Sequence, residues 1–443
     1  MNIKRIGATL VATGMVVGLA ACSTGGGGGD DADSGTTELL IWDGVNLAPT
    51  TEGGEGAENS FLHAAAAQFE EENEDISIEI VQTEGDISAS SAQFQAASIA
   101  GDGPDIRTSF TGGNTISFAD FLLDLDGTFD QEVMEDLSGW NTVREGYAED
   151  GALLGLPYGG GSYFYVFYNK EMAEAAGVDL STPPSTWEEM LDLAQDTIDG
   201  GQPGFFIANQ EGYVGAWVIA ALVGGELGDT AFTQMYNQEI PLDHPAMVKA
   251  YDAYSQLYER GLTNEDAGSV PNGDALSNFV QGNGTFHISG GWENAPLVEA
   301  MGDNVGVFPI PVMEGAEFPD TAAGGPNTAI SITNYSDHQE EAKEFLRFLA
   351  QPEIIDMYVE MTQTEASNSE SADPSVITNP LLQQEAEFLK TADAVVFPFD
   401  NVMPQGLIDL FYRVNATTFL GTTSPEDAVS QLADLGESEL GQE

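Results

Sequence analysis

The feature that most constrains the fold is the order of secondary structure near the start of the chain. Residues 38–42, ELLIW, have the composition of a strand, and residues 60–71 carry apolar side chains at helical spacing. Residues 76–81, ISIEIV, alternate between apolar and polar side chains, as a half-buried strand does. A strand, a helix and a second strand in this order predict a βαβ unit and therefore an α/β fold.

Length and composition predict two large lobes that fold without disulfides. About 400 residues follow a segment at 23–37 that is rich in Gly, Ser, Thr and Asp, and this is more than one ordinary domain holds. Apolar residues make up 42% of the chain, which is enough to build large cores. Cys22 is the one cysteine, so we expect no disulfide, no thiolate metal site and no cofactor.

The N-terminal residues have the pattern of an export signal. Two basic residues, Lys4 and Arg5, precede an uncharged run at 6–21 that is too short to span a bilayer as a helix. The run ends in Leu-Ala-Ala-Cys, which resembles the lipobox of bacterial lipoproteins. This resemblance implies a signal peptide at 1–21, a lipid on Cys22 and a lipidated flexible tether at 22–37. We therefore expect a protein exported to, and anchored at, the outer face of the bacterial cytoplasmic membrane.

The net charge excludes some partners. The chain holds 73 Asp and Glu against 11 Lys and Arg, and removal of residues 1–21 takes away two of the basic residues. Such a field opposes binding to nucleic acid. Two explanations stay open for the acidity: a solvated surface that keeps the protein soluble, or adaptation to high salt, where charges are screened.

The middle of the chain carries the most specific local signals. Residues 153–157 and 163–168 are predicted strands joined by glycines, and a short helix beginning near Lys170 is predicted to end at Gly177. Thr186 and Glu189 then have the spacing of a capping box. We expect Trp187, Trp140 and Trp217 to be packing residues in helices.

Five motifs in order resemble the extracellular solute-binding proteins that serve ABC importers, the family of the maltose-binding protein. They are GDGPDI at 101–106, the segment 151–190 with its Tyr-Asn-Lys and Pro-Ser-Thr-Trp-Glu-Glu motifs, GTFHISGGW at 284–292, FPIP at 308–311 followed by TAISI, and EEAKEFLRFLAQPE at 340–353. The resemblance implies a two-lobed periplasmic-binding-protein-like fold of type II, with a ligand cleft between the lobes. We place lobe one at 38–157 and 322–372, and lobe two at 158–321 and 373–443.

Carbohydrate sites combine flat aromatic rings with polar side chains at their edges. Trp42 and Asp43 end the first strand, at the carboxyl edge where open α/β sheets place ligands. The resemblance adds Trp292, which lies in the Gly-x-Trp motif of the family. The full predicted ligand-binding set is Trp42, Asp43, Phe110, Asn114, Tyr158, Glu211, Tyr213, Trp292 and Glu293. Packing roles compete with this interpretation for Trp42 and Trp292, and Glu211 could be one solvated acid among many.

Departures from maltose binders leave the ligand open. The loop after residue 106 lacks the Trp and the Asp-Arg pair found there in maltose binders, and the segment 399–414 lacks a Trp. These differences argue against maltose and leave the length, linkage and identity of the sugar undetermined. Glu52, Glu55 and Glu58 form an additional acidic loop to which the sequence assigns no role.

Other functional classes fit the sequence less well. We expect a monomeric protein that binds an oligosaccharide and delivers it to the permease subunits of an ABC importer. A cationic or other non-sugar solute, such as a polyamine or a glycerophosphodiester, is the alternative. A phosphate-bearing solute would need basic residues in the cleft, and Arg107 is the one basic residue in a predicted cleft loop. A glycoside hydrolase also needs two carboxylates, but the histidines are isolated and no catalytic motif is present. We therefore expect no enzyme activity and no catalytic residue.

Overall fold

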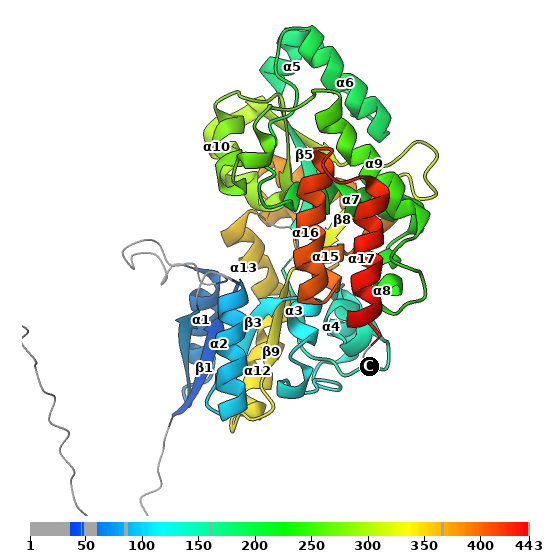
Figure 1. Ribbon diagram of the computed structural model, residues 1–443. Coiled ribbons are helices and arrows are strands. Elements are labelled where there is room, and N and C mark those ends of the chain that lie inside the picture. Colours follow the sequence, from blue (N-terminus) through cyan, green and yellow to red (C-terminus); the bar gives the residue numbers. More distant parts are fainter. Residues whose placement is uncertain are drawn as a thin grey trace, which may run out of the picture. The chain divides into compact units, whose positions relative to one another are not determined.

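The computed structural model describes residues 36–45, 47, 60–83, 87–159, 162–364 and 367–441. Cys22, the predicted signal peptide and nearly all of the predicted tether lie outside these residues, as do Glu52, Glu55 and Glu58. These residues form two five-stranded sheets surrounded by helices (Figure 1). We describe each sheet in turn, because the candidate site draws residues from both.

The first sheet has the strand order β2-β1-β3-β9-β4. Strands β1, β2 and β3 are parallel, whereas β9 runs antiparallel to both β3 and β4. Its strands are β1 (Thr37–Asp43), β2 (Ile76–Gln82), β3 (Ile106–Phe110), β4 (Leu156–Tyr158) and β9 (Thr328–Ile332). The predicted βαβ unit is confirmed, with α1 at Phe61–Glu72 between β1 and β2.

The predicted strand at 153–157 is wrong at its start, because only Leu156 and the two residues after it pair with β9. Leu153 instead accepts a backbone hydrogen bond from Leu125, and the Leu154 N–H donates to Val143. Both side chains are buried. An apolar run predicts burial here, but it does not distinguish a strand from a buried loop.

The second sheet has the order β10-β8-β5-β6, and β7 also pairs with β5. Strand β5 is antiparallel to β6, β7 and β8, and it pairs with β8 through Ser162 and Tyr163 at its start. The strands are β5 (Ser162–Asn169), β6 (Phe286–Gly290), β7 (Val305–Pro309), β8 (Thr321–Gly325) and β10 (Ala394–Val396). The neighbouring strands β8 and β9 thus belong to different sheets, and the chain crosses between the sheets at 326–327.

Helices cover both sheets, and their bounds follow the sequence signals closely. The α-helices not yet given are α2 (Ile87–Ala100), α3 (Gly113–Ile116), α4 (Gln131–Asp136), α5 (Lys170–Ala176), α6 (Trp187–Asp199), α7 (Tyr213–Leu227), α8 (Ala231–Tyr236), α9 (Pro245–Glu259), α10 (Ala275–Val280), α11 (Asn294–Met301), α12 (Gln339–Leu349), α13 (Pro352–Thr362), α14 (Pro380–Thr391), α15 (Phe399–Val402), α16 (Gln405–Phe419) and α17 (Pro425–Glu439). Helix α5 ends at Gly177 as predicted, with a left-handed φ of 78°.

The predicted capping box at α6 is half confirmed. The Thr186 hydroxyl accepts a hydrogen bond from the Glu189 N–H at 3.2 Å, as the spacing predicts. The Glu189 carboxylate, however, accepts from the N–H and the hydroxyl of Ser185, and these bonds lower its pKa. Trp187 is fully buried and donates its ring N–H to the Ala253 carbonyl, so its predicted packing role is confirmed.

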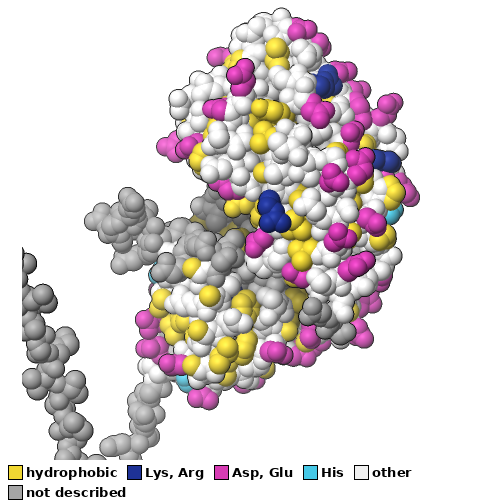
Figure 2. Space-filling view, in the orientation of Figure 1, with side chains coloured by type: hydrophobic (Ala, Val, Ile, Leu, Met, Phe, Trp, Pro, Cys, Tyr) yellow, Lys and Arg dark blue, Asp and Glu magenta, His cyan; other side chains and the backbone are white. Residues whose placement is uncertain are grey.

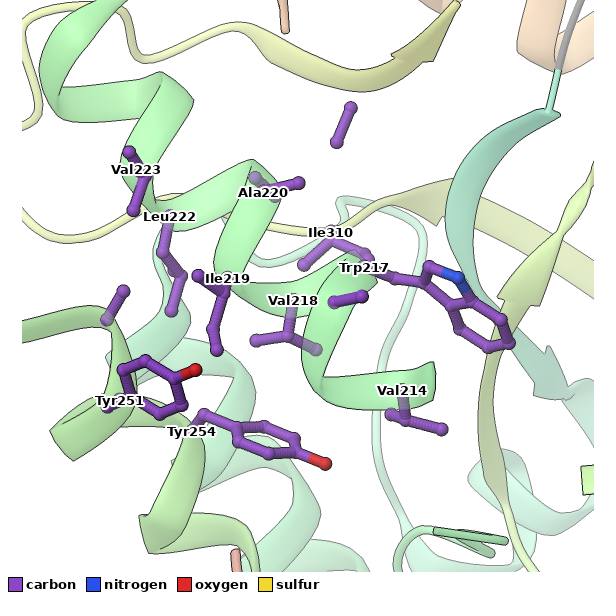
Figure 3. Close-up of a cluster of buried hydrophobic side chains, with 14 of the residues drawn as sticks. Val214, Trp217, Val218, Ile219, Ala220, Leu222, Val223, Tyr251, Tyr254 and Ile310 are labelled. Carbon is purple, nitrogen blue, oxygen red and sulfur yellow. The ribbon is translucent and has the colours of Figure 1, made fainter. Parts of the chain in front are cut away.

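The core beneath the second sheet is built around α7. Every residue of α7 from Val214 to Gly225 is buried, which is typical of a helix surrounded on all sides by other elements. Figure 3 shows Tyr251 and Tyr254 on one side of this helix, whereas the Trp217 ring projects from the other side. A second core joins the first sheet to α1, α12 and α13. No helix among the described residues is long and apolar enough to cross a membrane.

Candidate ligand-binding site

Three aromatic rings meet above the second sheet. Trp217 stacks on Phe164 of β5, with ring centroids 5.5 Å apart, and it meets Trp292 edge-on at 5.4 Å. Trp217 is only 7% exposed, so its predicted packing role is confirmed. Trp292 is only half-buried, and it follows β6 in the short 3₁₀ helix Gly291–Glu293. The core aromatic pair thus supports a third ring that is partly open to solvent.

Gly290 makes the position of Trp292 possible. A Cβ atom at residue 290 would lie 2.0 Å from the six-membered ring of Trp292, a distance that no side chain can occupy. The glycine therefore allows the ring to lie flat against its own backbone. This explains in physical terms why glycine precedes the tryptophan by two residues.

A second aromatic pair lies one helical turn away. Tyr213 begins α7, four residues before Trp217, so both side chains lie on the same face of the helix. Tyr213 meets Tyr412 of α16 edge-on at 4.8 Å. The Tyr412 hydroxyl donates to Asp400 Oδ2 at 2.8 Å. Burial raises the pKa of Asp400 and, together with the nearby carboxylate, that of Tyr412.

The first sheet contributes a small polar hollow at the carboxyl end of β3. Phe110 and Asn114 both line it, as the sequence places them. The Asn114 amide donates to the Ser91 hydroxyl at 3.4 Å. The remaining lining residues are Gly44, Ser90, Ser91, Arg107, Thr108 and Ser109.

Helix α15 connects this hollow to the aromatic residues of the other sheet. Gly112 has a left-handed φ of 71°, and a Cβ there would lie 2.0 Å from the Asn401 carbonyl oxygen. The next residue, Gly113, is similarly close to the Met403 carbonyl. Asp400 directly precedes Asn401, and Asn114 directly follows Gly113. The two groups of residues are therefore continuous across this backbone contact.

Trp42 and Asp43 have structural partners at the end of β1. Asp43 is 1% exposed, and its Oδ1 accepts hydrogen bonds from the Thr108 hydroxyl at 2.7 Å and from the Leu47 N–H at 3.2 Å. The carboxylate thereby fixes the turn after β1. Trp42 is half-buried against a small cluster that contains Phe94 and Phe118. Ligand contact by either residue stays a prediction.

Tyr158 and Glu211 also have roles within the fold. Tyr158 is 1% exposed and lies in the core of the first sheet, stacked on Phe61 with centroids 5.7 Å apart. Glu211 accepts the Asn272 N–H at 3.0 Å and so holds the short 3₁₀ helix Asn272–Asp274. Neither residue belongs to the aromatic groups described above, and their predicted contact with ligand is not tested.

Glu293 lies beside Trp292 but is directed toward a buried histidine. Its Oε2 is 2.8 Å from His287 Nε2, and the imidazole lies between the rings of Phe167 and Phe279. His287 belongs to β6 and is buried.

A buried carboxyl group, Glu385, is hydrogen-bonded to Asn294, the residue that follows Glu293. Glu385 of α14 is 2% exposed, and its Oε2 accepts a hydrogen bond from the Asn294 amide at 2.7 Å. Burial raises its pKa to about 8, and the bond from Asn294 opposes this shift. At neutral pH the group is therefore mainly a protonated acid.

Sequence reasoning missed Phe164, Asp400 and Tyr412 as members of this arrangement. Phe164 belongs to an aromatic strand run that carried no positional signal of its own. Asp400 and Tyr412 are twelve residues apart, so no helical or strand spacing relates them. Their pairing depends on the turn between α15 and α16. No set of three metal-binding side chains occurs among the residues that the structure describes.

A separate hollow of about 510 Å³ lies beside α5, between Tyr168 and Ser181. Lys170 and Asp179 line it, together with the end of α5. None of the predicted ligand-binding residues borders this hollow. It does not contribute to the candidate site.

Comparison with known proteins identifies the family of the chain. Residues 64–384 match the profile described as bacterial extracellular solute-binding protein, which covers more than half of the chain. The chain belongs to this family. Its members bind solutes and are exported, so this solute-binding protein functions outside the cytoplasm and is not an enzyme.

The relatives of this solute-binding protein are distant. The arabinooligosaccharide-binding protein of Halalkalibacterium halodurans is 24% identical over 46% of this chain and 44% of its own length. The sn-glycerol-3-phosphate-binding periplasmic protein of Brucella abortus is 27% identical over 46% of this chain and 47% of its own. The chain thus spans about half the length of these curated relatives.

A solved structure identifies the fold of this solute-binding protein. The chitin oligosaccharide binding protein is 17% identical, covers 92% of this chain and 99% of its own, and has a TM-score of 0.76. The predicted α/β fold of type II, with two lobes, is confirmed by this likeness.

Proposed function

We propose that this chain is the substrate-binding lipoprotein of an ABC importer, that it captures an oligosaccharide between its lobes, and that it delivers the sugar to permease subunits. The observation that carries the proposal is the half-buried Trp292, held edge-on by Trp217 beside the Tyr213, Tyr412 and Asp400 group. Such a surface offers ring faces and polar edges together.

The chemistry of sugars fits this surface. A pyranose ring has apolar C–H faces and a rim of hydroxyl groups, so it stacks on an aromatic ring while its hydroxyls seek donors and acceptors. Trp292 supplies the ring. Asp400 and the Tyr412 hydroxyl supply an acceptor and a donor that are already bonded to one another. The names of the arabinooligosaccharide and chitin oligosaccharide relatives support the same ligand class.

The remaining features of the proposal concern location and organisation. We infer that Cys22 carries the lipid, that residues 1–21 are removed, and that the mature protein stays as a monomer at the outer face of the cytoplasmic membrane. The lobes would comprise 38–157 with 322–372, and 158–321 with 373–443. Replacement of Cys22 by Ala is expected to release the protein from membranes, and membrane fractionation with an antibody checks this.

One observation favours a second candidate ligand. Tyr213, Tyr412 and Asp400 together resemble an aromatic cage with a carboxylate, which suits a cation such as a polyamine. Burial raises the pKa of Asp400 and so disfavours its charged form, which weakens this alternative. The carbohydrate therefore remains the proposed ligand.

A thermal-shift screen tests the proposal directly. The protein is melted alone and with neutral and acidic oligosaccharides, polyamines and glycerophosphodiesters. A ligand at about one hundred times its Kd adds roughly 2.7 kcal/mol of stability, which raises Tm by a few degrees. A shift with one group of oligosaccharides supports the proposal. A shift with amines alone transfers the function to the cation candidate, and a shift with no saccharide refutes the carbohydrate function.

A further inference from the structure

Arg107 is a buried cation without a carboxylate partner among the described residues. Its side chain belongs to β3, it is 4% exposed, and its Nη1 has no hydrogen-bond partner in the part of the chain described. Other arginines in the same chain behave differently: Arg144 pairs with Asp126 at 2.9 Å, and Arg260 pairs with Asp192 at 2.8 Å. In a chain this rich in acidic residues, a buried arginine that pairs with none of those the structure describes needs an explanation.

Aromatic rings offset part of the cost of burying this charge. The guanidinium carbon lies 4.2 Å from the ring centroid of Phe94 and 4.5 Å from that of Phe118. Such cation–π contacts stabilise a desolvated cation. Burial lowers the pKa of Arg107 to about 10, and nearby Tyr335 opposes this shift, so the side chain is still charged at neutral pH. The rings accept the charge but offer its N–H groups no acceptor atom.

The hollow beside Arg107 is lined by groups that can donate hydrogen bonds. Ser91 contributes a hydroxyl and Asn114 an amide, whereas the hydroxyls of Ser90 and Ser109 are already bonded to Thr83 and Thr115, and no lining residue that the structure describes is acidic. The nearest carboxylate with printed bonds to the lining is Asp43, which accepts from Thr108 and from backbone N–H groups of its own turn. A buried guanidinium beside a hydroxyl and an amide matches the needs of an oxyanion.

A backbone contact also joins the hollow to the proposed sugar site. Asn114 lines the hollow and follows Gly113, whose backbone abuts α15, and α15 contains Asp400. A ligand seated on the aromatic residues of the second sheet could therefore extend one substituent toward Arg107.

We propose that this hollow binds an oxyanion carried by the ligand, so that the substrate is an acidic saccharide rather than a neutral one. The inference rests on the proposed function and narrows its substrate class. The oxyanion is either the carboxylate of a uronic acid or the phosphate of a sugar ester, since both present oxygen acceptors to a guanidinium fork. The ligand would then supply the acceptor that the described chain does not give to Arg107.

Calorimetry with matched ligand pairs tests this on the full chain in detergent. The carboxylate arm compares oligogalacturonate with the neutral galactose oligomer of equal length, the phosphate arm compares a sugar phosphate with the free sugar, and inorganic phosphate is tested alone. We expect the acidic member of one pair to bind at least tenfold more tightly. Arg107→Met should remove that preference and leave the affinity for the neutral member within about twofold. Arg260→Met removes a more exposed, paired arginine and should change neither affinity.

A second variant keeps the test valid if Arg107→Met fails to fold. Ser91→Ala removes a hydroxyl from the rim of the hollow and should weaken the acidic ligand severalfold without affecting the neutral one. Equal affinities of wild-type protein for acidic and neutral members in both arms overturn the inference but leave the carbohydrate function intact. Binding of inorganic phosphate without any saccharide has the opposite meaning: the hollow binds an anion and the carbohydrate function is wrong.

Discussion

The two halves of the candidate site solve different physical problems. On the second sheet, Trp292 leans on Trp217 and Phe164, so the site there is an aromatic surface whose position is fixed by the core. On the first sheet, the hollow at β3 is lined by hydroxyl and amide groups around one buried guanidinium. The comparison teaches that the core can hold the aromatic side chains of a binding surface by ordinary packing. The polar hollow differs, because it contains a buried guanidinium that has no carboxylate partner among the described residues.

The largest expected effect comes from removing the aromatic surface. Trp292→Ala should weaken binding of the cognate oligosaccharide by about 100-fold, in the range of interface residues whose truncation costs more than 2 kcal/mol. Isothermal titration calorimetry measures the loss. Trp140→Phe is the control, because Trp140 packs against Phe129 in the other core and should leave affinity unchanged. Equal affinities of wild-type and Trp292→Ala protein would remove the aromatic half from the comparison.

A buried acid on α14, which packs against β7 of the second sheet, gives the next largest effect, on stability rather than affinity. Glu385 has a pKa of about 8 in the folded protein against an ordinary value of 4.5. Between these values the unfolded chain loses a proton that the folded chain keeps, so the wild-type protein loses stability as pH rises from about 4.5 to 8. Glu385→Gln cannot ionise, and it should be more stable by on the order of 2 kcal/mol at pH 7.

Chemical denaturation of the Glu385→Gln variant across pH tests this sign. The stability gain should be close to zero at pH 4.5 and should increase toward pH 8. Glu387→Gln, an exposed change on the same helix, should show no such trend. A pH-independent difference between the variant and wild-type protein would mean that Glu385 is ionised in the folded state. The region beside the second sheet would then contain a buried anion at Glu385, as the first sheet contains a buried cation at Arg107.

The smallest expected effect comes from the polar edge of the aromatic half. Tyr412→Phe removes the hydroxyl that donates to Asp400 at 2.8 Å and should weaken oligosaccharide binding by about fivefold, equivalent to roughly 1 kcal/mol. Tyr258→Phe also removes a hydroxyl that donates a hydrogen bond, here to the Glu265 carbonyl, and serves as the control. An unchanged affinity for Tyr412→Phe would assign the Tyr412 and Asp400 pair to the fold alone.

Sequence alone predicts the local parts of this molecule well. The strand β2, the helical spacing of α1 and the hydroxyl cap at Thr186 depend on neighbouring residues, and the structure confirms them, although only Ile76 of β2 is buried. The strand expected from Leu153 fails because Leu153 forms only an isolated bridge with Arg144, and the sheet pairing begins at Leu156. Patterns of neighbouring residues predict helices and strands, but they do not predict which apolar runs pair with another strand in a sheet.

The candidate site shows the same division more sharply. Sequence reasoning predicts Tyr213 and Trp292 as ligand contacts, and the structure places Tyr213 one turn from Trp217 on α7 and Trp292 against the Trp217 ring. The hydrogen bonds of Asp43 and Glu211, and the pairing of Asp400 with Tyr412, join residues distant in sequence. Nothing near those residues in the sequence indicates their partners, so roles within the fold could not be separated there from roles in binding.

The charge pattern of the surface follows from composition and needs no tertiary information. Figure 2 shows acidic side chains spread over the visible face, with few basic ones among them. Most of the described basic residues lie at the surface, and several pair with carboxylates. What composition could not indicate is that one arginine is withdrawn from this surface into β3.

The closeness of two indole rings has an optical consequence. Trp217 and Trp292 lie 5.4 Å apart with planes at 65°, close enough for their electronic transitions to couple. A ring that stacks on Trp292 would change both the shielding of that indole from water and its angle to the other. The near-ultraviolet circular dichroism and the tryptophan emission of the unlabelled protein would then report ligand occupancy, which makes the chain a sensor without any attached dye.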